Sequence, residues 1–208
     1  ILDQARERAR HLGLSGAAFP WRTIHGEECS AYWPAGTAAL HLNAVIARAV
    51  DRYREVTGDT GLEAECGLEI LVETARLWVS HGHHDHDGVW HVDGVTGPDE
   101  YSAVADDNLF TNLMAARNLR AAADACARHP EHADRLGVGP DEPEAWRPAA
   151  AAVHVPYNER LGVHEQSQDF TRYAPWNFAE SRPEQPLMMH APYFQLYRRQ
   201  VIKQADLV

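Results

Sequence analysis

Two long amphipathic segments, separated by only three residues, constrain the fold most strongly. In both, apolar side chains recur at intervals of three and four residues, which is the helical period. They are Leu42, Val45, Ile46, Ala49, Val50, Tyr53 and Val56 in residues 35–57, and Leu62, Cys66, Ile70, Leu71, Thr74, Leu77 and Trp78 in residues 61–80. Gly58 is expected to end the first helix, and the short linker predicts that the two pack antiparallel within a larger helical assembly.

Four further segments read as helices. They are residues 1–12, 107–129, 141–152 and the stretch from Pro192 to the end of the chain. The inner face expected for the helix at 107–129 carries Leu109, Phe110, Leu113, Met114, Arg117 and Ala121. Asp141 is expected to cap the helix at 141–152, and Pro192 suits the first turn of the C-terminal helix. The sequence therefore predicts an all-α fold with long irregular segments at 13–36 and 153–187.

Charge and composition exclude several classes of partner. The chain has 208 residues, enough for one domain or at most two, and its net charge is −11. This acidity argues against nucleic acid and anionic membrane surfaces, which attract basic proteins. We find no apolar run of the roughly 18 residues that cross a membrane, and no signal-peptide pattern. The three cysteines are odd in number and scattered, so we expect a cytoplasmic protein.

Residues 81–87, HGHHDHD, concentrate four histidines and two aspartates. Imidazole and carboxylate are good zinc ligands. However, all of them crowd into one glycine-containing segment, whereas a defined site holds its ligands on separate rigid elements. A solvated interhelical loop is the favoured interpretation, and we expect no metal and no cofactor.

Two segments carry residues suited to sugar chemistry. The paired Asp99-Glu100 follows a Gly-Pro turn and precedes a helix, which is a suitable place for a general acid. On local chemistry alone, a solvated turn explains the same residues, and it is the more common case. The segment 13–36 places Trp21 and Trp33 near His25 and Glu27, which suits a sugar ring but equally suits a loop anchored in the core.

Three motifs together identify a family. The chain contains GAAFPWRTIHGEECS near its start, GVTGPDEY followed by DNLFTNLMAARNLR, and YFQLYRRQVIKQADLV at its end. In order and spacing they closely resemble glycoside hydrolase family 65, the inverting phosphorylases of maltose, trehalose and kojibiose, with some hydrolases among their relatives. The resemblance implies that residues 1–208 are part, roughly half, of an (α/α)6 barrel. The family's N-terminal β-sandwich, its Trp-Asp glucose-binding motif and its downstream phosphate-binding loop are not found.

The resemblance also assigns roles to single residues. Glu100 matches the family's general acid. The matched substrate-binding positions are Lys203 and Gln204 at the glucose subsite, His25 and Glu27 at the acceptor subsite, and His91 and Tyr101 beside the acid. Such an acid protonates the glycosidic oxygen, which is otherwise a poor leaving group.

The resemblance implies that inorganic phosphate, a co-substrate rather than a cofactor, attacks the opposite face of the sugar. The products are then β-glucose 1-phosphate and glucose, from a disaccharide whose linkage the sequence leaves open. Two alternatives remain: a trehalase-like hydrolase of the same family, and a non-catalytic sugar-binding or helical interaction module. We expect the full-length protein to be a homodimer, and residues 1–208 alone to be inactive because they lack the phosphate-binding loop.

Overall fold

The computed structural model describes residues 1–31, 36–180 and 193–205. Its main helices are α1 (Leu2–His11), α3 (His41–Thr57), α4 (Leu68–His81), α5 (Leu109–Arg128), α6 (Pro130–Arg135) and α7 (Asp141–Ala151). A single turn, α9 (Tyr193–Leu196), and two 3-10 turns, η2 (Phe170–Arg172) and η3 (Phe178–Glu180), lie in the C-terminal part. None of the described helices is long and apolar enough to cross a membrane.

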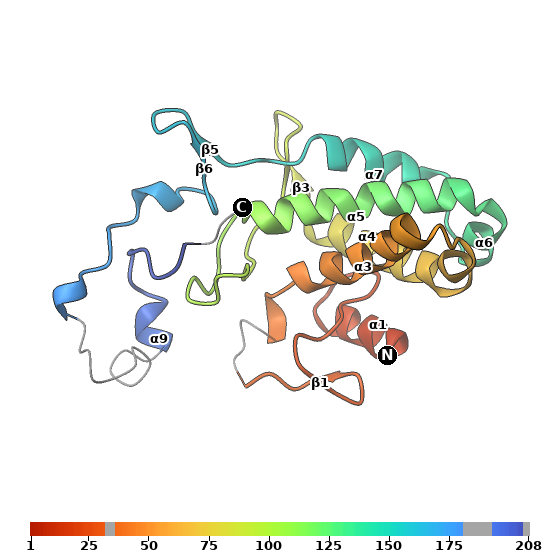
Figure 1. The fold of residues 1–208 in the computed structure, drawn as a ribbon, viewed down its shortest axis with the longest axis horizontal. Helices are drawn as coiled ribbons and strands as arrows, with labels where there is room; N and C mark the ends of the chain where they lie inside the picture. Colours follow the sequence, from red (N-terminus) through yellow and green to blue (C-terminus); the bar gives the residue numbers. More distant parts are fainter. Residues whose placement is uncertain (32–35, 181–192, 206–208) are drawn as a thin grey trace.

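Helix α5 is the centre of the helical body, and it packs against α3, α4 and α7 (Figure 1). Its buried face is made largely of small residues, which lets neighbouring helices approach closely. The buried apolar members are Leu109, Ala115, Ala116, Leu119, Ala122, Ala123, Ala125 and Cys126. The predicted inner face is therefore partly wrong, because Leu113 is exposed, and Arg117 is half-buried and pairs with Asp51 and Glu55 of α3.

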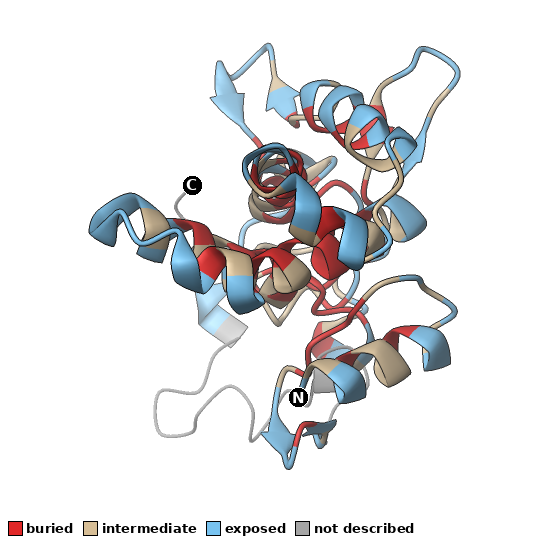
Figure 2. Ribbon diagram, turned by 90° about the vertical axis from the view of Figure 1, so that its right-hand side faces the viewer, coloured by how far each residue is buried: buried red, intermediate tan, exposed pale blue. Residues whose placement is uncertain are grey.

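The two long helices predicted first are present, with corrections. A π-helical turn, η1 (Glu63–Gly67), leads directly into α4, and Gly58 ends α3 in the left-handed conformation. Helix α3 begins at His41 rather than near residue 35, because the Ala38 carbonyl accepts a hydrogen bond from the Thr96 N–H instead of serving a helix. Ala44 and Ala47 are buried on α3, whereas the predicted Val45, Tyr53 and Val56 are exposed. Figure 2 shows that the helices carry buried residues on one side and exposed residues on the other.

The C-terminal helix is much shorter than predicted. Among the described residues it spans only Tyr193–Leu196; Pro192 and residues 206–208 lie outside them. The physical reason is that the backbone at Gln200 and Ile202 pairs with Ala174, which leaves it unable to pair within a helix. Helix α7 also differs in detail, since Pro140 is its N-cap residue and Asp141 lies in the first turn without capping it.

Within the described residues, three short antiparallel hairpins extend from the helices. They pair β1 (Thr23–Ile24) with β2 (Glu27–Glu28), β3 (His83–His84) with β4 (Trp90–His91), and β5 (Tyr157–Asn158) with β6 (Val163–His164). The second hairpin corrects the prediction of a plain interhelical loop at 81–87. Its far strand starts at Trp90, whose buried ring packs in the same core cluster as Trp78 of α4.

Candidate active site

The loop that carries Asp99-Glu100 has a closed base. We call residues 93–107 the acid loop. Val95 and Ala105 exchange two backbone hydrogen bonds, with N···O distances of 3.0 and 2.8 Å, and the Thr96 hydroxyl donates to the Ala103 carbonyl. Gly97 presses against the start of α5, where an added Cβ would lie 2.4 Å from the Asn108 side-chain nitrogen. The two ends of the loop are therefore fixed at the N-terminus of α5.

The two acidic residues at the tip have different surroundings. Asp99 is only 1% exposed. Its carboxylate accepts hydrogen bonds from the Tyr101 N–H at 2.8 Å, the Ser102 hydroxyl at 2.6 Å and the Gln166 amide at 3.3 Å. Glu100 is half-buried, and within the described residues no group forms a hydrogen bond or ion pair with its carboxyl. Asp99 thus braces the loop, whereas Glu100 is the carboxyl that is available for a ligand.

A second segment supports the acid loop from the side. The Gln166 carbonyl accepts hydrogen bonds from the Leu109 N–H at 3.0 Å and the Asn108 amide at 3.2 Å. The Gln168 N–H donates to the Asp106 carbonyl at 3.0 Å. These contacts join the irregular segment 165–168 to the first turn of α5. Sequence reasoning missed Gln166, since nothing in its local pattern marks it.

Lys203 lies near enough to Asp99 for the two charges to interact. Its ammonium donates to the Leu196 carbonyl at 3.0 Å and the Arg199 carbonyl at 3.1 Å. Burial lowers the pKa of Lys203, and the nearby charge of Asp99 opposes this shift without cancelling it. Gln204 follows directly and is half-buried. The structure therefore places Lys203 near the acid loop, and Gln204 is its neighbour in the chain.

His91 lies at the base of the acid loop. Its Nδ1 is 2.7 Å from an Asp107 oxygen, and its Nε2 is 3.5 Å from an Asp85 oxygen. Burial disfavours the charged imidazole, but these two carboxylates outweigh it and raise the pKa of His91. The polar contacts of His91 are thus with aspartates at the base of the acid loop. Tyr101 directly follows Glu100 in the chain and is half-buried.

The predicted acceptor-subsite residues lie elsewhere. His25 and Gly26 form the positive-φ turn of the β1–β2 hairpin, and both His25 and Glu27 are exposed. Figure 1 shows this hairpin beside α1, away from the start of α5. In the described part of the chain, therefore, the structure does not bring His25 and Glu27 to the acid loop.

The neighbouring Glu28 is the inward-facing carboxylate of that hairpin. It accepts hydrogen bonds from the Trp21 N–H at 2.6 Å and the Ser30 N–H at 2.8 Å. Burial favours its neutral form, but the hydrogen bonds from Ser30 and Trp21 prevail and lower the pKa of Glu28. We conclude that Glu28 holds the shape of this segment.

Trp21, by contrast, is connected to the acid loop. Its ring lies 5.5 Å from that of His41, which in turn lies 6.1 Å from the ring of Phe110 on α5. His41 Nδ1 is 3.0 Å from the Thr96 carbonyl oxygen. Trp21 is therefore placed toward the candidate site, whereas Trp33, singled out with it in the sequence, lies outside the described residues.

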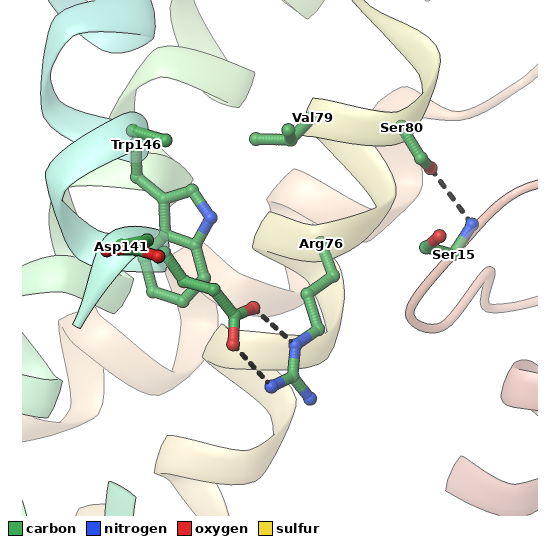
Figure 3. Close-up of a pocket in the computed structure, with 8 residues that line it drawn as sticks. Ser15, Arg76, Val79, Ser80, Asp141 and Trp146 are labelled. Carbon is green, nitrogen blue, oxygen red and sulfur yellow. Dashed lines mark hydrogen bonds and ion pairs between the residues drawn. The ribbon is translucent and has the colours of Figure 1, made fainter. Parts of the chain in front are cut away.

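A separate hollow lies between α4 and α7 (Figure 3). Val79 and Trp146 supply apolar walls, and Arg76 forms a two-fold ion pair with Glu142, with N···O distances of 2.6 and 2.8 Å. The Ser80 hydroxyl also accepts a hydrogen bond from the Ser15 N–H at 3.0 Å. This hollow involves no acid-loop residue, and we do not assign the chemistry to it.

Comparison with known proteins agrees with the motifs. The family model described as the glycosyl hydrolase family 65 central catalytic domain matches residues 1–208. The chain belongs to glycosyl hydrolase family 65. Family 65 members include the phosphorylases below, so the resemblance drawn from the sequence is confirmed at the level of the family.

Three relatives illustrate the range of family 65. An uncharacterized glycosyl hydrolase of Mycobacterium tuberculosis is 65% identical over all of this chain, which spans 26% of that protein. The alpha,alpha-trehalose phosphorylase of Geobacillus stearothermophilus is 44% identical over all of this chain, which spans 28% of it. A solved structure named "Putative kojibiose phosphorylase from human microbiome" matches with a TM-score of 0.88 and 25% identity, over 99% of this chain and 31% of that one. The chain thus spans about a quarter of the length of its curated relatives.

Proposed function

We propose that the full-length protein containing this chain is an inverting disaccharide phosphorylase, in which these residues form roughly half of an (α/α)6 barrel. The observation that carries the proposal is the arrangement of the acid loop, with Asp99 held by three donors and Glu100 half-buried without a partner in the described structure. Identity of 44% and 40% to two trehalose phosphorylases, against 30% to a maltose phosphorylase, favours trehalose as the disaccharide.

Each group has a defined part in this reaction. The Glu100 carboxyl gives its proton to the glycosidic oxygen as the bond from that oxygen to the anomeric carbon breaks. A phosphate oxygen bonds to the same carbon from the opposite face, which gives β-glucose 1-phosphate and glucose. General acid catalysis of this kind contributes roughly 10²–10⁴-fold. Phosphate is a co-substrate, and no cofactor takes part.

Lys203 is suited to binding the glucose unit. An ammonium group has three N–H donors. Two of them point at the Leu196 and Arg199 carbonyls, which fix the position of the group. The third is left for a substrate hydroxyl, and Gln204 beside it can both donate and accept. A homodimer and a cytoplasmic location remain predictions for the whole protein.

The test uses the full-length protein. It is incubated with trehalose, maltose, kojibiose or nigerose, with and without phosphate, and glucose and β-glucose 1-phosphate are followed. Glu100→Gln keeps the size of the side chain but removes the acid, and it should lower phosphorolysis by at least about 100-fold. Glu131→Gln, on the exposed first turn of α6, is the matched control and should leave the rate unchanged.

Each outcome separates the candidates. Sugar phosphate formed only with phosphate, and lost in Glu100→Gln, supports the proposal. Equal glucose release without phosphate would identify a hydrolase of the same family. Sugar binding without any turnover would identify a non-catalytic module, and full activity of Glu100→Gln would refute the assignment of the acid.

A further inference from the structure

Three imidazole rings form a stack at the base of the acid loop. The ring centroids of His83 and His91 lie 5.6 Å apart with an angle of 25° between the planes, and those of His91 and His154 lie 5.0 Å apart at 28°. The rings come from β3, from β4 and from the segment after α7, so separate parts of the chain hold them. His154 is tied in place because its backbone N–H donates to the Trp90 carbonyl at 2.8 Å.

Aspartates surround this stack without a fixed positive partner. An Asp107 oxygen lies 2.7 Å from His91, and an Asp93 oxygen lies 3.8 Å from His83 Nε2. In residues 1–31, 36–180 and 193–205, no lysine or arginine forms an ion pair with Asp85, Asp93, Asp106 or Asp107. The negative charges of Asp106 and Asp107 act on Asp93, so negative charge is crowded here. Only the imidazoles are available to balance it.

Two of the aspartates are held in position by outer partners. Asp107 is 4% exposed, and its Oδ1 accepts hydrogen bonds from the Asn112 amide at 2.8 Å and the Val92 N–H at 3.3 Å. This leaves its Oδ2 directed at His91. The Asp93 carbonyl contacts His81 Nε2 at 2.9 Å, which fixes the backbone there. Outer contacts of this kind orient the ligands of established metal sites.

We propose that His91, Asp93 and Asp107 bind one divalent transition-metal ion of the zinc class. One ligand atom from each lies within 4.8 Å of the other two, and the mixed nitrogen and oxygen donors suit such an ion. His83, stacked on His91 and close to Asp93, is placed to complete the coordination. The ion supplies the positive charge that the aspartates lack.

The position of this site gives it a structural consequence. His91 and Asp93 precede the Val95–Ala105 pair, and Asp107 follows it. An ion that joins them therefore fastens the two ends of the acid loop to each other and to the start of α5. This inference does not depend on which reaction the protein catalyses.

The experiment is a binding titration on the full-length protein after treatment with a chelator. Zn²⁺ binding is measured by calorimetry, and Co²⁺ is used as a spectroscopic probe of histidine ligation. Asp93→Asn and His91→Gln should each weaken Zn²⁺ binding by more than the roughly 10–100-fold that loss of an outer contact costs. His86→Gln is the matched control, because its side chain is 89% exposed in the same hairpin and lies outside the proposed site.

The results separate this site from its rival at the tip of the hairpin. Asp85, His86 and Asp87 also lie close together there, and they are largely exposed. One equivalent of Zn²⁺ that binds to the wild type and to His86→Gln, but weakly to the other two variants, supports the proposal. Loss of binding in His86→Gln, or unchanged binding in Asp93→Asn and His91→Gln, overturns it. Absence of stoichiometric Zn²⁺ binding and of a Co²⁺ spectrum in the wild type also overturns it, without relying on any variant.

Discussion

Glu63 is the most completely buried acidic side chain among the ion pairs described, and its replacement provides a quantitative test of the fold. Its carboxylate is 1% exposed and receives four contacts: Arg128 Nε and Nη2 at 2.9 Å each, Arg54 Nε at 3.0 Å and His129 Nε2 at 2.9 Å. It lies in the π-helical turn between α3 and α4 and binds the end of α5 to both. Burial disfavours its charge, but the arginines and His129 lower its pKa below the ordinary value of 4.5.

Glu63→Gln keeps the shape of the side chain but removes its negative charge. The N–H₂ group of the new amide then faces the N–H donors of Arg54, Arg128 and His129. Breaking a buried ion pair by removing one partner costs about 3–5 kcal/mol. The side chains of Arg54 and Arg128 are 26% and 32% exposed, so water can partly solvate them after the change. We therefore expect a loss of stability near the lower end of this range, about 3 kcal/mol, which raises the equilibrium constant of local opening roughly 160-fold.

Amide hydrogen exchange of the full-length protein measures this opening directly, in peptides that cover residues 61–70 and 125–132. Glu65→Gln, on the exposed side of the same turn, is the control and should change the free energy of local opening by less than about 0.5 kcal/mol. Because the pKa of Glu63 is depressed in the folded state, its stabilisation is present above pH 4.5 and is lost as the pH falls below that value. The reasoning would be refuted if Glu63→Gln and Glu65→Gln exchanged equally. It would also be refuted if the wild type stayed more stable than Glu63→Gln at pH values far below 4.5.

Three further changes test the acid loop and the packing around it. Asp99→Asn leaves one of three donors unpaired at a cost of roughly 1–3 kcal/mol, and it should lower kcat of phosphorolysis in the full-length enzyme more than Ser102→Ala does. Asn108→Ala removes the cap of α5 and its bond to Gln166, and it should lower the melting temperature through a loss of about 1–2 kcal/mol. Gly16→Ala should destabilise the protein in thermal melts far more than Gly13→Ala, although both have φ +73°, because only at Gly16 would the added Cβ lie 2.0 Å from the Glu73 carbonyl oxygen; equal losses would contradict this.

Local pattern was sufficient for the two long helices and for the family. The stripes in 35–57 and 61–80 and the stop at Gly58 depend on residues near one another in the chain, and the structure contains both helices. The three family motifs are also contiguous, and the family model covers the same residues. The assignments of Glu100 and Lys203 came with those motifs, and they remain predictions until the variants are assayed.

Only the tertiary structure decided which of two adjacent carboxylates turns inward. Asp99 is held by the neighbouring Tyr101 and Ser102 and also by Gln166, which is distant in sequence. Glu28 rather than Glu27 faces the Trp21 backbone. The C-terminal helix stops for the same reason, since Ala174 takes the backbone groups that a helix needs. The sequence by itself determined that the two long helices form and which family the chain belongs to. Long-range hydrogen bonds, which no local period encodes, decided how the acid loop is held and which histidines and aspartates meet at its base.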